Sequence, residues 1–86
     1  MMCVIIKDLG IFIQTVMDIK DKEEMLDFLR GILTPQELEE IPMRLKIVKM
    51  LKQGVAQHEI ASRLGVGVST VTRGSKEIQK GRFNHV

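Results

Sequence analysis

The stretch QHEIASRLGVGVSTVTRG, residues 57–74, has the residue spacing of a helix-turn-helix. Gln57 opens it, Ala61 lies where a crossing helix leaves room for only a small side chain, and Gly65 lies where the chain leaves the first helix. Glycine is favoured there because it readily adopts the left-handed backbone that ends many helices. The apolar residues expected to hold the two helices at roughly 90–120° are Ile60, Leu64, Val66 and Val71.

The second helix of this motif has an unusual surface. It is predicted to begin near Val68 or Ser69, with the Ser69 hydroxyl as its cap. Small hydroxyl residues follow where a solvated helix usually carries Glu or Lys. Gly74 lies in its middle, at a cost of about 1 kcal/mol relative to alanine. This bare surface would allow another molecule to approach the backbone closely.

The rest of the chain also has helical periodicity, with no strand-like alternation of any length. A first helix is expected from about Lys7 to Met17. Asp18 or Asp21 is the expected cap of the next helix, and Gly31 lies near its end. The sequence therefore predicts an all-α fold of about five to six short helices.

A capping box marks the start of a third helix. In the stretch TPQE, Thr34 stands at the cap, Pro35 at the first helical position and Glu37 three residues after the cap. Pro42 then removes a backbone donor, so we expect either a kink or two short helices end to end. An amphipathic pattern resumes at residue 43 and ends at Gly54. Its apolar residues are Leu45, Ile47, Val48 and Leu51.

Composition excludes several classes of protein. Eighty-six residues make one domain at most, and a chain this short buries only about 60–65% of its unfolded surface. Cys3 is the sole cysteine, so it is read as a small apolar residue, with no intrachain disulfide, no usual metal-binding spacing and a reducing cytoplasmic setting. The apolar start is interrupted by Lys7 and Asp8, so we expect no membrane span and no export signal.

Charge is unevenly distributed along the chain. Residues 1–43 carry four basic and nine acidic side chains, a net charge of −5, whereas residues 44–86 carry nine basic and two acidic ones, a net charge of +7. A basic half around a compact helical motif is typical of nucleic-acid binding, although an ordinary solvated surface is the alternative.

DNA contact is expected mainly from the start of the second helix, because a recognition helix enters the major groove with its N-terminal residues against base edges. Short hydroxyl side chains can bond bases or phosphates directly or through water. In the alternative, they are only local caps and helix surface. The expected contact residues are Gln57, His58, Val68, Ser69, Thr70, Thr72, Arg73 and Lys76.

An enzyme is not expected. The sequence has no nucleophile–base pair, no paired carboxylates placed for a cleft and no phosphate-binding loop. The glycines of GVGVST, residues 65–70, lack the preceding strand that a nucleotide-binding fingerprint requires.

The runs LTPQELEEIPMRLKIVKMLKQG and EIASRLGVGVSTVTRGS resemble the Trp repressor family, with TVTRGS as the most specific element. The connection GVAQHEI and the upstream IKDKEEMLDFLRGILT are more similar to its YerC/YecD branch. The resemblance covers roughly residues 11–80. It implies an intertwined homodimer with two recognition helices about 34 Å apart on a palindromic operator. Dimerisation would also compensate for the small core. One domain, 1–86, would then comprise a dimerisation part at 1–54, a DNA-reading head at 55–80 and a tail at 81–86.

The resemblance also implies a corepressor pocket, in which two arginines flank a tryptophan indole and backbone groups hold its ends. A guanidinium group can stack on a planar ring. Phosphate contact or ion pairing of the arginines is the alternative. The matching positions are Leu33, Thr34, Arg44, Arg73 and Gly74. Gly74 would be bare so that a ligand or partner helix can lie against it.

Three departures bear on this implication. Glu77 stands where the family has a ligand-binding hydroxyl, so its carboxylate would favour a ligand's ammonium group or pair with Arg73 or Arg44. Pro42 replaces a small residue. The final KGRFNHV is too short for the family's C-terminal helix, for which Phe83 is a candidate substitute. Three outcomes remain open: L-tryptophan as corepressor, another small ligand, or none.

Two functions are compatible with these sequence features. The first is a sequence-specific DNA-binding transcriptional regulator, a repressor that binds a palindromic operator as a dimer. The second is a helical dimerisation or interaction module that does not bind DNA. In that case the basic residues of 44–86 would point in all directions rather than onto one face.

Overall fold

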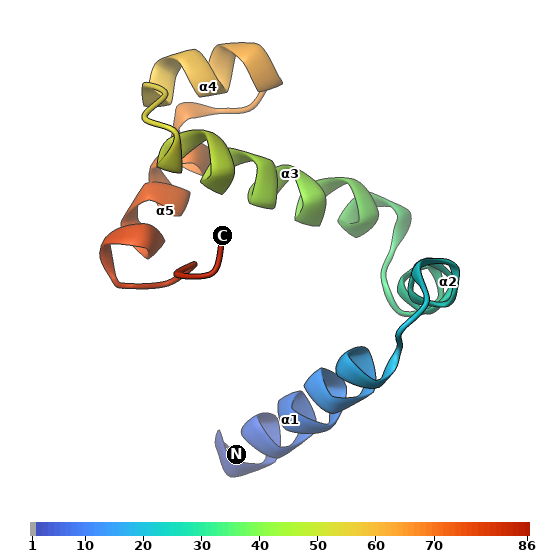
Figure 1. The fold of residues 1–86 in the computed structure, drawn as a ribbon. Coiled ribbons are helices and arrows are strands. Elements are labelled where there is room, and N and C mark those ends of the chain that lie inside the picture. Colours follow the sequence, from blue (N-terminus) through green and yellow to red (C-terminus); the bar gives the residue numbers. More distant parts are fainter. Residues whose placement is uncertain (1) are drawn as a thin grey trace. The chain divides into compact units, whose positions relative to one another are not determined.

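The computed structural model describes the backbone of residues 2–86 and the side chains of residues 6–86, so the prediction for the Cys3 side chain lies outside the described residues. The described chain is all-helical and contains no strand, which confirms the predicted fold class. Dimerisation stays a prediction. The helices are α1 (Met2–Asp18), α2 (Lys22–Ile32), α3 (Pro35–Lys52), α4 (Gln57–Leu64) and α5 (Val68–Gln79) (Figure 1).

The chain divides into two compact units, Met1–Leu38 and Glu39–Val86. In the first unit, α1 begins earlier than the predicted Lys7 because the apolar residues before it continue the helix. Asp21 is the cap of α2, and its carboxylate accepts a hydrogen bond from the Glu24 amide at 3.2 Å. The division of the single domain into a dimerisation part, a DNA-reading head and a tail stays a prediction.

The first unit has no buried side chain among residues 6–38. The rings of Phe12 and Phe28 lie 6.2 Å apart between centroids, but Phe12 is still 37% exposed. The large apolar residues of this unit that remain exposed are Ile6, Leu9, Ile11, Phe12, Ile13, Met17, Leu26 and Ile32. Helices with this much uncovered apolar surface lack a core of their own.

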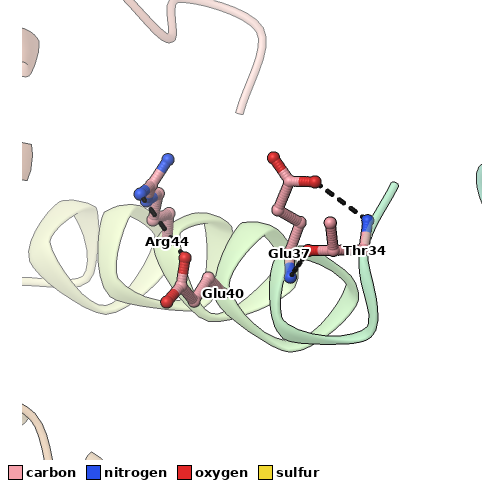
Figure 2. Close-up of polar contacts among 4 residues, drawn as sticks. All are labelled: Thr34, Glu37, Glu40 and Arg44. Carbon is pink, nitrogen blue, oxygen red and sulfur yellow. Dashed lines mark hydrogen bonds and ion pairs between the residues drawn. The ribbon is translucent and has the colours of Figure 1, made fainter. Parts of the chain in front are cut away.

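The predicted capping box starts α3 (Figure 2). The Thr34 hydroxyl accepts from the Glu37 amide at 3.1 Å, and a Glu37 carboxylate oxygen accepts from the Thr34 amide at 2.9 Å. The prediction of two short helices around Pro42 is wrong, because α3 continues through it as one helix. Proline removes one backbone donor, and the hydrogen bonds on either side hold the helix together. A kink stays a prediction.

The second unit is built around a small core. Its buried residues come from three helices: Ile47 and Val48 of α3, Ile60 and Ala61 of α4, and Val71 of α5. Leu64 and Val66 are half-buried against this core, so the predicted buried side of the helix-turn-helix is confirmed in its main residues.

Leu45 is the exception to the predicted apolar face of α3. It is 44% exposed. Leu45 stands two residues before Ile47, and at 3.6 residues per turn that places it on nearly the opposite side of the helix. Ile41 is exposed to the same degree, 44%.

The turn between α4 and α5 follows the prediction at its first glycine and differs at the cap. Gly65 has φ +68°, and its amide donates to the Ala61 carbonyl. The cap of α5 is Gly67, which has no side chain, so the prediction that Ser69 caps the helix is wrong. The helix begins at Val68, which places Ser69 inside its first turn.

Gly65→Ala is predicted to destabilise the protein by about 1–2 kcal/mol, because an L side chain strains a left-handed backbone. Space is not the cause, since a Cβ atom at this position would meet no atom within 4 Å. Gly65→Asn is the matched control and should lose less stability than Gly65→Ala, because asparagine tolerates the left-handed conformation better. Urea unfolding measures both, and equal losses would contradict the explanation.

Candidate nucleic-acid interface and adjoining pocket

One exposed face of α5 gathers most of the predicted DNA-contact residues. Val68 is 50% exposed, and Ser69, Thr70, Arg73 and Lys76 are exposed as well. A shallow depression of about 530 Å³ runs along this face. It is lined by Val68, Ser69, Thr72, Arg73, Lys76, Glu77 and Lys80. Hydroxyl groups therefore lie toward the start of α5 and cationic side chains further along it.

The start of α5 has no side-chain cap. Gly67 cannot accept a hydrogen bond from the first turn through a side chain, although its carbonyl accepts from the Thr70 amide at 3.1 Å. The first turn also contains no acidic residue. Free amides and the helix dipole make such an end locally positive, so it suits an approaching phosphate.

Gln57 and Thr72 are joined to each other. The Thr72 hydroxyl donates to the Gln57 side-chain carbonyl at 2.7 Å, linking the start of α4 to the middle of α5. Both side chains are half-buried, so Thr72 lies less outward than predicted. This bond fixes the orientation of the Gln57 amide group. His58, the next residue in α4, is exposed.

A second cavity, of about 450 Å³, lies in the unit that contains α5. It is lined by Arg44, Ile47, Val48, Ser69, Thr70, Arg73, Gly74, Glu77 and Phe83. Four of the predicted pocket residues therefore come together, namely Arg44, Arg73, Gly74 and Glu77. Leu33 and Thr34 belong to the first unit and are not among the lining residues. Thr34 has its hydroxyl engaged in the capping box.

Gly74 brings α5 close to α3. A Cβ atom at this position would lie 3.5 Å from Ile47 Cγ2 and from Leu51 Cδ1, which is ordinary van der Waals contact. An alanine would therefore fit here without displacing α3. Packing alone does not explain a glycine that disfavours the helix, and Gly74 is also one of the residues that line the cavity.

The sequence suggests pairing of Glu77 with Arg73 or Arg44 as one option, but the structure shows other partners. The Glu77 carboxylate pairs instead with Lys80, 3.4 Å from Oε1, and with Arg82, whose Nε lies 3.1 Å from Oε2. The Arg82 contact is an ion pair without hydrogen-bond geometry, and the buried Oε2 accepts no hydrogen bond within the described part of the chain. Arg44 pairs with Glu40, with 4.0 Å between Nη2 and Oε2 (Figure 2).

Comparison with known proteins agrees with this architecture. The family model described as "Trp repressor protein" matches residues 7–85. The chain belongs to the Trp repressor family.

Individual relatives support the same assignment. The Trp operon repressor homolog of Vibrio cholerae is 43% identical over 61 residues, which cover 70% of this chain and 57% of that protein. The homolog of Vibrio campbellii is 32% identical over 74 residues, or 85% of this chain and 74% of that protein. The uncharacterized protein YerC of Bacillus subtilis is 28% identical over 67 residues, or 78% of this chain and 64% of that protein.

Membership of the Trp repressor family has two immediate consequences. The family is one of regulatory DNA-binding proteins, so the prediction that the chain is not an enzyme is confirmed. The match to YerC agrees with the resemblance to that branch. Within residues 2–86, no helix combines the length and apolar character needed to cross a bilayer.

Sequence reasoning missed part of the cavity's surroundings. The sequence suggests Phe83 only as a substitute for a helix contact, whereas the structure places it in the cavity wall. Lys52 donates to the carbonyl oxygens of Phe83 and, at 3.2 Å, of Val86, which holds the last residues against the end of α3. Side chain to carbonyl bonds across 31 and 34 residues leave no periodic signal in a sequence.

Thr72→Val is predicted to cost about 1 kcal/mol of stability, because valine keeps the shape of the side chain and removes its bond to Gln57. Thermal or urea unfolding of the purified protein gives the value. Thr70→Val is the matched control, since Thr70 is exposed on the same helix. It should stay within about 0.5 kcal/mol of the parent, and equal effects of the two substitutions would contradict a role for the bond.

Gly74→Ala is predicted to stabilise the protein by up to about 1 kcal/mol, because alanine favours the helix and the cavity wall accepts its methyl group. Chemical unfolding tests this, and a loss of stability would show that α3 and α5 are packed too closely for a Cβ atom.

Proposed function

We propose that this member of the Trp repressor family is a sequence-specific, DNA-binding transcriptional repressor that acts in the cytoplasm. The observation that carries the proposal is the exposed face of α5. There, an uncapped helix start, short hydroxyl side chains and cationic side chains occupy one surface. This combination suits the major groove, where a recognition helix places its first residues against base edges.

The residues of this face divide by the chemistry they offer. Ser69 and Thr70 present hydroxyl groups for base edges or for bridging water, and the Val68 side chain suits a thymine methyl group. Arg73 and Lys76 follow on the same helix and offer charge to phosphates. The Gln57 amide and exposed His58 lie at the start of α4, where they suit a flanking phosphate.

We propose further that the repressor is a homodimer on a palindromic operator. The support comes from residues 6–38, where no side chain is buried and eight large apolar side chains are exposed. A second copy of the chain offers the same apolar surface, and two-fold self-complementary contacts are the commonest way to cover one. Two α5 helices about 34 Å apart would then meet successive turns of a duplex.

A small corepressor at the cavity is the third part of the proposal, with L-tryptophan as the candidate suggested by the family. Ser69, Thr70 and Arg73 belong both to the cavity wall and to the exposed face of α5. A ligand that contacts them from the cavity would change the position of groups that DNA meets from outside. Coupling between the two sites therefore needs no long pathway. Leu33 and Thr34 are proposed as further ligand contacts on the resemblance alone.

The decisive experiment selects duplexes from a random pool with the purified protein, with and without L-tryptophan. A ligand concentration of about 1 mM matches the dissociation constant of a weakly bound metabolite. We expect a palindromic consensus whose affinity falls steeply with salt, because phosphate contacts release counterions. Enrichment of no sequence would favour the alternative, a helical interaction module that does not bind DNA.

Two substitutions divide the expected contacts by kind, measured by fluorescence anisotropy on the selected duplex. Lys76→Ala should weaken binding to all sequences alike and reduce the salt slope by about 1. Thr70→Ala should instead reduce the preference for the selected duplex over a scrambled one and leave the salt slope unchanged. Identical behaviour of the two variants would contradict this assignment of roles.

A further inference from the structure

The residues after α5 form an organised segment beside the cavity. The Arg82 amide donates to the Glu77 carbonyl at 3.1 Å, and the Val86 amide donates to the Phe83 carbonyl at 3.2 Å. Lys52 holds the segment from α3 through the carbonyls of Phe83 and Val86. The end of the chain consequently lies back against the second unit (Figure 1).

Two residues of this segment contact the cavity wall in different ways: Phe83 belongs to the lining residues, and Arg82 pairs with Glu77, which is one of them. The guanidinium group of Arg82 approaches the Glu77 carboxylate, and the ring of Phe83 forms part of the cavity wall. Phe83 has φ +64°, a left-handed backbone that a phenylalanine rarely adopts, so its neighbours hold it in place. One residue of the segment thus lines the cavity, and its neighbour pairs with a carboxylate of the cavity wall.

The contact with Glu77 is incomplete. Oε2 of Glu77 is buried and accepts no hydrogen bond from the described residues, although Arg82 Nε lies 3.1 Å away. A buried carboxylate oxygen without a hydrogen bond is unfavourable, and a directed bond from a cationic donor would stabilise it. The Arg82 side chain is 66% exposed, so its ion pair holds the position only weakly.

We infer that residues 81–86 act as a ligand built into the chain, and that an aromatic compound with an ammonium group binds the cavity by displacing Arg82 from Glu77. The inference rests on the proposed ligand pocket and adds its regulation. The ammonium group forms the bond that Oε2 lacks, and the aromatic ring replaces Phe83 at the cavity. The segment thereby sets the ligand concentration at which the cavity fills.

The test compares three indole compounds on the 86-residue chain. Tryptamine has the ammonium group without a carboxylate, indole-3-propionate has the carboxylate without an ammonium group, and L-tryptophan has both. The chain has no Trp and no Tyr, so ligand fluorescence is followed without interference from the protein. Titration at about 0.15 M salt limits electrostatic interactions between exposed charges to a range of about 8 Å.

Arg82→Ala should raise the affinity for tryptamine and L-tryptophan by up to about fivefold, which corresponds to the free energy that an exposed ion pair contributes. Affinity for indole-3-propionate should not rise, because that ligand has no group for Glu77. His85→Ala is the control within the same segment, and its three affinities should match those of the parent. Unchanged or weaker tryptamine binding by Arg82→Ala would overturn the inference.

Hydrogen exchange gives an independent measure of displacement. The Arg82 and Val86 amides, both hydrogen-bonded in the free protein, should exchange faster when tryptamine saturates the cavity. Slower exchange would mean that the segment closes over the ligand and would overturn displacement. If no indole compound binds either protein, both this inference and the corepressor proposal fail, whereas duplex selection tests DNA binding separately.

Discussion

The structure depends on a core of very few side chains, contributed by three helices. Ile47, Ile60 and Val71 are almost completely buried, and they join α3, α4 and α5. Ala61 is small enough to let the helices meet, and Gly65 turns the chain between α4 and α5. This core fixes the exposed face of α5 relative to α3, on which both the proposed DNA interface and the cavity depend.

The small size of this core bears on the proposal that a second copy covers the first unit. All the buried residues among 6–86 lie in α3, α4 and α5, while among residues 6–32 of α1 and α2 eight large apolar side chains remain exposed. Short chains bury a low fraction of their surface, and association is a common solution. In the proposed account, one half of the chain supplies an interface between copies and the other supplies the surface that reads DNA.

Local signals in the sequence were sufficient for much of the fold. The Thr34–Glu37 capping box and the left-handed Gly65 depend on residues close in sequence and follow the prediction, and Asp21 is one of the two caps that the sequence offers for α2. Two predictions were wrong at positions where adjacent residues decide whether a helix continues or where it begins. Pro42 did not divide α3 into two helices, and Gly67 took the cap position expected for Ser69.

Four of the residues that line the cavity were predictable from the sequence, whereas their contacts were less so. The resemblance located Arg44, Arg73, Gly74 and Glu77, which the fold then brings to one cavity. It gave no indication that Glu77 pairs with residues of the following segment, because those contacts depend on how the last residues lie against α3. Long-range contacts of exposed side chains have no periodic pattern from which to predict them.

Sedimentation equilibrium of the 86-residue chain tests the central claim most directly, because in the proposed account a second copy covers the apolar surface of residues 6–38. The chain mass is 9.8 kDa, so the account predicts a species of twice that mass at micromolar concentration. A species of 9.8 kDa at several hundred micromolar, with its helices intact by circular dichroism, would contradict it.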